Sequence, residues 1–130
     1  VFSDQIEKGG TVELICGTPG ADTQVQTNLQ IITSIYDYGL NVAEAIEGPR
    51  WTHYQDKTNS AYPHKEENFL EIENRISKET FENMRNKGHK TVSSGGFGGA
   101  GCAGAIQIYG KEKTLFASSD LRKDGYSSVW

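Results

Sequence analysis

The hydrophobic pattern is clearest between residues 11 and 39, where a predicted strand leads through a short turn into a predicted helix. Residues 11–16 alternate apolar and polar side chains and are rich in β-branched types, which is typical of a strand with one buried face. Beyond the turn, apolar residues recur at helical spacing at Val25, Leu29, Ile31, Ile32, Ile35 and Tyr36. Gly39 suits the left-handed end of that helix.

Residues 16–22 (CGTPGAD), which we term the hinge, form the turn between this strand and helix. Asp22 is the expected N-cap, because its carboxylate can accept from the N–H groups of the first helical turn. Backbone N–H groups exposed at such a turn can hold a phosphate, a carboxylate or the oxyanion of an acyl-transfer intermediate. The alternative is that the hinge only connects the strand to the helix.

The rest of the pattern predicts strands and helices that come in groups, so the expected class is α+β. Residues 1–3 are expected to pair with residues 12–16 across a turn at residues 7–10, whose two glycines permit the positive φ angles of a hairpin. Further helices are predicted to begin at the caps Asn41 and Ser77 and to end at Gly48 and Gly88. Further extended segments are predicted at residues 50–54, 69–73, 89–92, 105–109 and 114–117, with a polar loop at 55–67.

The length and composition of the chain limit which classes of function it can have. The chain has 130 residues, 35% of them hydrophobic, with no internal repeat or linker, so we predict a single domain over residues 1–130. No apolar run approaches the ~20 residues needed to cross a bilayer, so no membrane span is predicted. The net charge is −4 and the basic residues are scattered, which argues against a nucleic-acid partner.

The cysteines and histidines do not form a metal-binding pattern. Cys16 and Cys102 lie far apart, and no second Cys or His stands at ligand spacing from either. Two buried thiols are favoured over a disulfide, although the spacing leaves both open. His53, His64 and His89 share no helical i, i+4 spacing. We therefore predict neither a metal site nor a cofactor.

Residues 96–101 (GFGGAG) match the letters of a dinucleotide-binding motif. That motif requires a helix opening at its third glycine, so that the helix N-terminus meets the pyrophosphate. Here the following residues, 105–109, form a short β-type run that ends at Gly110. The sequence therefore favours a loop that is either flexible or so closely packed that Cβ atoms would clash. Near the C-terminus, Asp120, Arg122 and Asp124 are expected to hold the last loop through charge-assisted hydrogen bonds.

Seven blocks of the sequence form a recognisable series: residues 17–24, 29–30, 37–46, 48–51, 88–92, 105–107 and 119–125. In this order they resemble the C-terminal half of the small subunit of the gamma-glutamyltransferase (gamma-glutamyltranspeptidase) family. The resemblance covers nearly the whole chain and is weaker between residues 55 and 87. One departure is Leu121, which stands where the family usually has proline.

The resemblance implies the C-terminal portion of an N-terminal-nucleophile hydrolase, an αββα sandwich made as a self-cleaving precursor. A threonine outside this chain would attack a gamma-glutamyl amide such as glutathione, with its own α-amino group as the base. The family's Pro-Gly-Gly turn offers backbone N–H groups to the oxyanion, and the matching residues here are Gly20 and Ala21. Ala21 replaces a glycine, and a backbone donor tolerates that methyl group if φ is negative.

The resemblance also sets expectations for partners and supporting residues. The expected partners are the remainder of the precursor, namely the large subunit and the N-terminal part of the small subunit, and a small gamma-glutamyl substrate. Self-association is the alternative way to cover apolar surface. Structural roles are assigned to Asp22, Arg50, Asp120 and Arg122, whereas no residue is assigned to substrate binding.

Competing interpretations are a catalytically silent scaffold or interaction domain, and a related amide acylase. We take Val1 to be a cut inside a longer polypeptide. A Thr-Thr-His-like segment upstream of Val1 would favour the enzyme. Family members are often exported, but this chain carries no targeting signal, and its location is left open.

Overall fold

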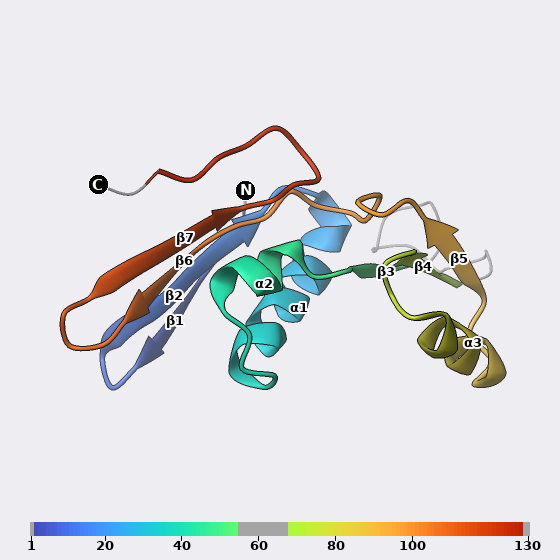
Figure 1. Cartoon of the computed structure of the whole chain (residues 1–130), viewed down its shortest axis with the longest axis horizontal. Helices are drawn as coiled ribbons and strands as arrows, with labels where there is room; N and C mark the ends of the chain where they lie inside the picture. The colour runs from blue at the N-terminus through green and yellow to red at the C-terminus, as the bar shows by residue number, and fades with distance from the viewer. Residues whose placement is uncertain (1, 55–67, 129–130) are drawn as a thin grey trace. The chain divides into compact units, whose positions relative to one another are not determined.

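The computed structural model describes residues 2–54 and 68–128, which fall into two compact units. The first unit comprises Val1–Gly48 with Gly101–Trp130, and the second comprises Pro49–Ala100. Each unit has its own β-sheet with α-helices beside it, as Figure 1 shows. The mixture of grouped strands and helices agrees with the α+β class that the sequence predicts.

The first unit is built on an antiparallel sheet with the order β1-β2-β6-β7. The strands are β1 (Phe2–Lys8), β2 (Thr11–Thr18), β6 (Gly104–Tyr109) and β7 (Thr114–Ser119). The predicted hairpin is confirmed, with φ values of 59° and 78° at Gly9 and Gly10, but its turn is shorter than predicted because Glu7 and Lys8 belong to β1. Such angles favour glycine, which has no Cβ to clash with the backbone.

Two helices pack against this sheet and complete its core. They are α1 (Gln24–Tyr36), which contacts β2, and α2 (Val42–Glu47), which contacts β6 and β7. The predicted cap of α2 is confirmed, because Asn41 and Glu44 form a reciprocal capping box. The core side chains are Leu14, Cys16, Ile31, Ile35, Val42, Ala45, Ile46, Ala103 and Ala105.

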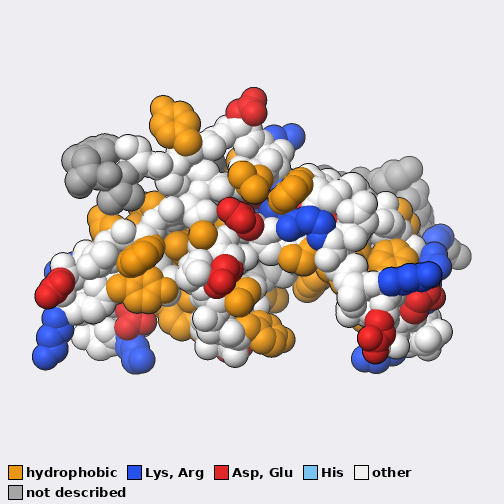
Figure 2. All heavy atoms as spheres, viewed as in Figure 1, with side chains coloured by type: hydrophobic (Ala, Val, Ile, Leu, Met, Phe, Trp, Pro, Cys, Tyr) orange, Lys and Arg blue, Asp and Glu red, His pale blue; other side chains and the backbone are white. Residues whose placement is uncertain are grey.

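The buried face of α1 differs from the apolar stripe read from the sequence. Ile31 and Ile35 are buried together with Thr27 and Asn28, whereas Val25 is 75% exposed. The Asn28 side chain donates to a carboxylate oxygen of Asp4 on β1 at 2.6 Å, which turns this polar face toward the sheet. Figure 2 shows hydrophobic side chains, in orange, that remain on the surface of this unit.

The sheet of the first unit also has an outward face that is largely apolar, formed by Ile15, Ile106, Leu115 and Ala117. Ile15 pairs with Ile106, and Ile106 pairs with Ala117. Side chains alternate along a strand, and the neighbours Leu14 and Ala105 are buried against the helices. The outward face is therefore the other side of the sheet, and Ile15, Ile106 and Leu115 are 40%, 40% and 46% exposed.

The second unit contains a three-stranded sheet with the order β3-β4-β5 among its described residues. Its elements are β3 (Trp51–Tyr54), β4 (Phe69–Glu73), α3 (Lys78–Asn86) and β5 (Thr91–Ser94). β4 pairs antiparallel with β3 and parallel with β5, to which α3 connects it. Ser77 caps α3 as predicted, whereas the predicted loop at 55–67 lies outside the described residues.

Candidate functional site

The hinge leaves β2 at Thr18 and enters α1 through one 3₁₀ turn, Ala21–Thr23. Gly20 has a φ of 141° and Ala21 a φ of 47°. The carbonyl oxygen of Gly20 accepts from the Thr23 backbone N–H at 3.0 Å and from the Thr23 hydroxyl at 2.9 Å. These two bonds close the turn, and both Gly20 and Ala21 lie exposed on it.

The backbone N–H groups of Gly20 and Ala21 converge on one point, which the side chain of Gln24 occupies. When the carboxamide is oriented by its hydrogen bonds, Gln24 Oε1 accepts from the Ala21 N–H at 3.2 Å and from the Gly20 N–H at 3.3 Å. Two fixed donors aimed at one oxygen are the arrangement that an oxyanion hole requires. The turn therefore brings together the donors of the two residues that the sequence singled out.

Ala21 adopts a conformation that the sequence interpretation did not expect. The negative φ required for an easily tolerated methyl group is not found, because φ is 47°. In this left-handed region a side chain crowds the following carbonyl, at a cost of roughly 1–2 kcal/mol. Its N–H still lies beside that of Gly20, since both donate to the same oxygen. The methyl group therefore strains the turn without removing its donor.

The predicted capping role of Asp22 is wrong. Asp22 lies inside the 3₁₀ turn and is exposed, and the N-cap position of α1 falls on Thr23. No side chain caps α1 there, because the Thr23 hydroxyl is used by the Gly20 carbonyl. The extra turn between Gly20 and the helix thus moves the cap one residue along the chain.

The segment Gly101–Ala103 contacts the hinge at Thr18. The buried hydroxyl of Thr18 accepts from the Cys102 N–H at 2.9 Å and donates to the Pro19 carbonyl at 2.8 Å. A Cβ on Gly101 would lie 2.7 Å from that hydroxyl oxygen, and the φ of Gly101 is 87°. Both facts restrict residue 101 to glycine. The close contact of this segment with Thr18 holds the end of β2 in place.

A buried ion pair joins this support to α2 and to the C-terminal loop. Arg122 Nη1 lies 2.9 Å from Asp120 Oδ1, and Asp120 Oδ2 accepts from the Ala103 N–H at 2.9 Å. Arg122 also donates to the carbonyls of Ile46 and Gly48, which terminate α2. These charge-assisted bonds to carbonyls at the end of α2 fix the three segments together.

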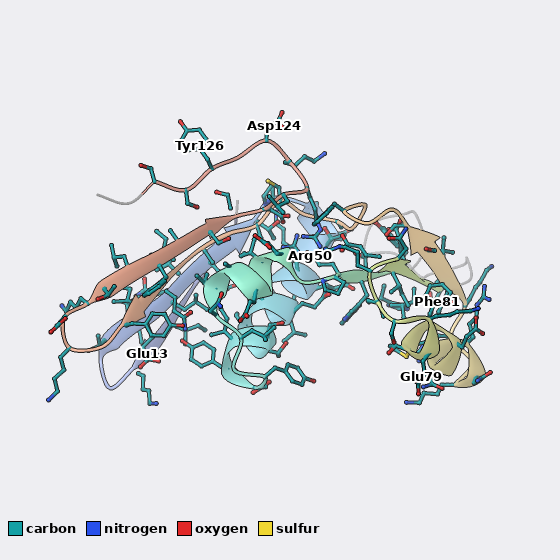
Figure 3. All side chains as sticks on the ribbon, in the orientation of Figure 1. Glu13, Arg50, Glu79, Phe81, Asp124 and Tyr126 are labelled. Carbon is teal, nitrogen blue, oxygen red and sulfur yellow. The ribbon has the colours of Figure 1, made fainter. Side chains whose placement is uncertain are left out.

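Asp124 does not share in this network. The sequence predicts that it helps to hold the loop, but it is exposed, and Figure 3 shows it at the bend of the C-terminal segment, directed away from the sheet. Within the loop, Asp120 and Arg122 make the buried contacts.

In the second unit, Arg50 belongs to a cluster of hydrogen-bond donors around one buried carboxylate, that of Glu73, which the sequence interpretation missed. Glu73 is fully buried and accepts from the Arg50 backbone N–H at 3.1 Å, the Gly99 N–H at 2.9 Å and Arg75 Nη2 at 2.8 Å. Several donors to one buried carboxylate compensate for its removal from water. The sequence showed Glu73 only as the end of an alternating strand.

The glycine-rich loop is packed against this cluster. A Cβ on Gly98 would lie 2.8 Å from a backbone nitrogen, and a Cβ on Gly99 would lie 2.7 Å from the buried carboxylate. Arg75 Nε donates to the Gly96 carbonyl, and its guanidinium lies 4.0 Å from the centre of the Phe97 ring. Of the two predicted alternatives, a flexible or a closely packed loop, the structure shows close packing, and the element that follows is the strand β6 rather than a helix.

Both cysteines are free thiols. Burial, with a smaller contribution from the Asp4 carboxylate, raises the pKa of Cys16 to about 11, so this thiol is protonated at neutral pH. Within residues 2–54 and 68–128, no three His, Cys, Asp or Glu side chains are grouped as a metal site would require. In the same residues, every helix is too short or too polar to cross a membrane.

A surface cavity of about 800 Å³ lies at the β6–β7 hairpin, away from the hinge. It is at the Tyr109 end of β6, whereas Gly104, at the other end, pairs with Gly17 of the hinge. The cavity contains no hinge residue. Its lining residues are Asn41, Tyr109, Gly110, Lys111, Glu112, Thr114 and Phe116.

Residues 5–130 match the sequence profile of the family described as Gamma-glutamyltranspeptidase. One curated relative is the "Glutathione hydrolase-like YwrD proenzyme" of Bacillus subtilis, 32% identical over 119 residues, which are 91% of this chain and 21% of the relative. Another is the "Glutathione hydrolase proenzyme" of Escherichia coli, 31% identical over 117 residues, or 90% and 18% of the two chains. The chain thus spans about a fifth of the length of these relatives.

Solved structures share this fold. A mutant gamma-glutamyltranspeptidase of Helicobacter pylori matches with a TM-score of 0.75 and 26% identity, over 94% of this chain and 60% of that one. A cephalosporin acylase of Bacillus halodurans matches with a TM-score of 0.79 and 23% identity, over 97% and 22% of the two chains, a likeness in fold alone. The predicted fold class, α+β of the N-terminal-nucleophile hydrolase type, is confirmed.

Proposed function

The chain belongs to the gamma-glutamyltranspeptidase family, and we propose that it is the C-terminal portion of an enzyme that cleaves gamma-glutamyl amides such as glutathione. Two curated relatives named for glutathione hydrolysis support this substrate class. We also propose that residues 1–130 act as a single domain of that enzyme, which is supported by a match to one solved structure over 94% of the chain. The nucleophilic threonine belongs to a part of the protein outside this chain.

In the proposed reaction the hinge stabilises the tetrahedral intermediate. The threonine hydroxyl gives its proton to the threonine α-amino group and its oxygen adds to the gamma-carbonyl carbon, so the carbonyl oxygen gains the negative charge. Collapse of the intermediate breaks the C–N bond, the amine leaves with a proton, and water or an acceptor amine then cleaves the glutamyl ester. The observation that carries the proposal is the convergence of the Gly20 and Ala21 N–H groups on one oxygen at 3.3 and 3.2 Å.

The surrounding contacts suit this role, because an oxyanion hole must be held rigidly. The Thr18 hydroxyl and the Asp120–Arg122 pair fix the segments behind the hinge. Donors fixed in advance need no reorganisation when charge develops on the substrate. Asp120 and Arg122 are therefore proposed as positioning residues for the hinge, and Arg50 as a structural residue of the second unit.

The proposed partner of the outward face is the remainder of the same precursor, namely the large subunit and the N-terminal part of the small subunit. Exposed Ile15, Ile106 and Leu115 support this, since contiguous apolar surface of this kind marks an interaction site. Purified alone, the chain is expected to self-associate or to bind a hydrophobic dye. A monodisperse monomer that leaves the dye dark would contradict the assignment.

The test of function compares the full-length protein with the 130-residue chain. The full-length protein is expected to release the chromophore from a gamma-glutamyl anilide and to hydrolyse glutathione. The chain alone is expected to do neither, because an oxyanion hole cannot catalyse amide cleavage without a nucleophile. Release above a mock preparation by the chain alone, or no activity of the full-length protein on either substrate, would overturn the proposal.

A further inference from the structure

Gln24 places a carbonyl oxygen at the point where the proposed oxyanion would form. It is the first residue of α1, and with its carboxamide oriented by its hydrogen bonds its Oε1 accepts from both hinge donors, Ala21 N–H at 3.2 Å and Gly20 N–H at 3.3 Å. The side chain is half-buried, and the turn that it reaches is exposed. A carboxamide oxygen is the same kind of acceptor as the amide oxygen of a gamma-glutamyl substrate.

We propose that Gln24 is an internal occupant of the hinge, which a substrate carbonyl must displace, and that it thereby sets the apparent affinity of the site for acyl donors. This inference rests on the proposed function of the hinge. Gln24 is a specificity-determining residue in this scheme, since it competes with the substrate oxygen and takes no part in bond making or breaking.

The geometry makes displacement easy. Hydrogen bonds of 3.2 and 3.3 Å are longer than the usual 2.9–3.0 Å between nitrogen and oxygen, so Gln24 binds the donors weakly. Rotation of its side chain leaves the turn unchanged, because the Thr23 bonds to the Gly20 carbonyl close the turn independently of Gln24. An oxyanion is a stronger acceptor than a neutral amide, so the advantage of the substrate grows toward the transition state.

Competition within the protein acts on binding rather than on chemistry. An occupied hinge reduces the fraction of molecules that can accept a substrate, and the apparent affinity falls by that fraction. Once the substrate saturates the site, Gln24 is displaced and turnover is unaffected. Replacing Gln24 by a residue without an acceptor should therefore lower KM and leave kcat unchanged.

The experiment measures KM and kcat of the full-length protein with a gamma-glutamyl anilide. For Gln24→Ala we expect KM to fall about three- to tenfold, as for the loss of two weak neutral hydrogen bonds. For Gln24→Glu we expect KM to rise about tenfold, because a carboxylate binds the same donors more tightly. Gln30→Ala is the control, since the Gln30 amide donates to the Gln26 carbonyl further along α1, and its KM should match the parent.

A second readout needs no substrate. Amide hydrogen exchange of Gly20 and Ala21 should be several-fold faster in Gln24→Ala than in the parent or in Gln30→Ala. Unchanged exchange, an unchanged KM, or a fall in kcat as from a purely structural residue would each overturn the proposal. If Gly20→Val abolishes turnover while Gln24→Ala changes nothing, the role of Gln24 alone fails. If neither variant changes the kinetics, the oxyanion role of the hinge fails with it.

Discussion

The hinge and the glycine-rich loop at residues 95–99 are both glycine-containing turns, and they use their backbone N–H groups in opposite ways. The Gly99 N–H is bound by Glu73, a fully buried carboxylate. The N–H groups of Gly20 and Ala21 are bound by a neutral side chain on an exposed turn. A donor already bound to a buried charge cannot serve a ligand, whereas a donor covered by a displaceable side chain can.

The two turns also need glycine for different reasons. A Cβ on Gly99 would meet the buried carboxylate at 2.7 Å, so packing excludes a side chain there. Gly20 instead has a φ of 141°, which side chains rarely adopt. The loop that matches a dinucleotide motif by its letters is thus a packing element, and the less glycine-rich hinge carries the available donors.

The largest effect is expected from disturbing the hinge in the full-length protein. A Val at Gly20 must leave the φ of 141° and clear the Thr23 hydroxyl, which a Cβ would approach to 2.6 Å, so the donor moves. Loss of one oxyanion donor typically lowers kcat by ~10²–10³, about 3–4 kcal/mol of transition-state stabilisation. Circular dichroism and binding of a gamma-glutamyl ligand should match the parent, and kcat within about threefold of the parent would remove the oxyanion role.

The second-largest effect is a loss of stability when Glu73, which binds the glycine-rich loop, is replaced. Glu73→Ala leaves Arg75 and two backbone N–H groups without their carboxylate, which should lower the free energy of unfolding by about 3–5 kcal/mol. Glu73→Gln keeps an acceptor and should cost less. Denaturant titration measures both, and kcat per folded molecule should stay at the parent value. A kcat loss without a stability loss would contradict a packing role.

A smaller effect is expected within the glycine-rich loop itself. Gly99→Ala forces a methyl group against the carboxylate and should cost about 1–3 kcal/mol of stability. Gly95→Ala is the matched control, since a methyl group there would have nothing within 4 Å and the φ of Gly95 is not in the left-handed region. The control should leave the melting temperature unchanged or slightly raised. Equal melting temperatures for the two variants would refute the packing explanation.

The smallest effect is a gain. Ala21→Gly removes a left-handed strain of roughly 1–2 kcal/mol, and the more flexible unfolded glycine takes back about 0.4–1 kcal/mol. The net result should be about 0.5–1 kcal/mol of added stability with the N–H donor retained. Thermal unfolding and kcat measure the two parts, and a destabilised variant would show that the φ of 47° is not strained.

The sequence correctly predicted the structural features that are decided by residues close together in the chain. The Asn41–Glu44 capping box and the Gly9-Gly10 turn are each decided within a few residues, and both are confirmed. Glu73 was missed because its burial is decided by partners elsewhere in the fold, such as the Gly99 N–H.

At the hinge, Gly20 and Ala21 were named from the sequence, but two features of the turn were not foreseen. The cap was misplaced because Gly20 opens a 3₁₀ turn before α1, so the N-cap falls on Thr23 instead of Asp22. Gln24 was overlooked because its side chain reaches the donors only once that turn has formed.

The most direct test of the central claim follows the backbone N–H groups while an oxyanion mimic binds. The full-length protein, labelled with ¹⁵N in glycine and alanine, is titrated with a phosphonate analogue of a gamma-glutamyl amide, whose tetrahedral oxygens mimic the intermediate. We expect the amide signals of Gly20 and Ala21 to shift downfield, as for stronger hydrogen bonds, while those of Gly98 and Gly99 stay in place. Saturating binding that leaves Gly20 and Ala21 unshifted, or shifts Gly98 and Gly99 instead, would contradict the account.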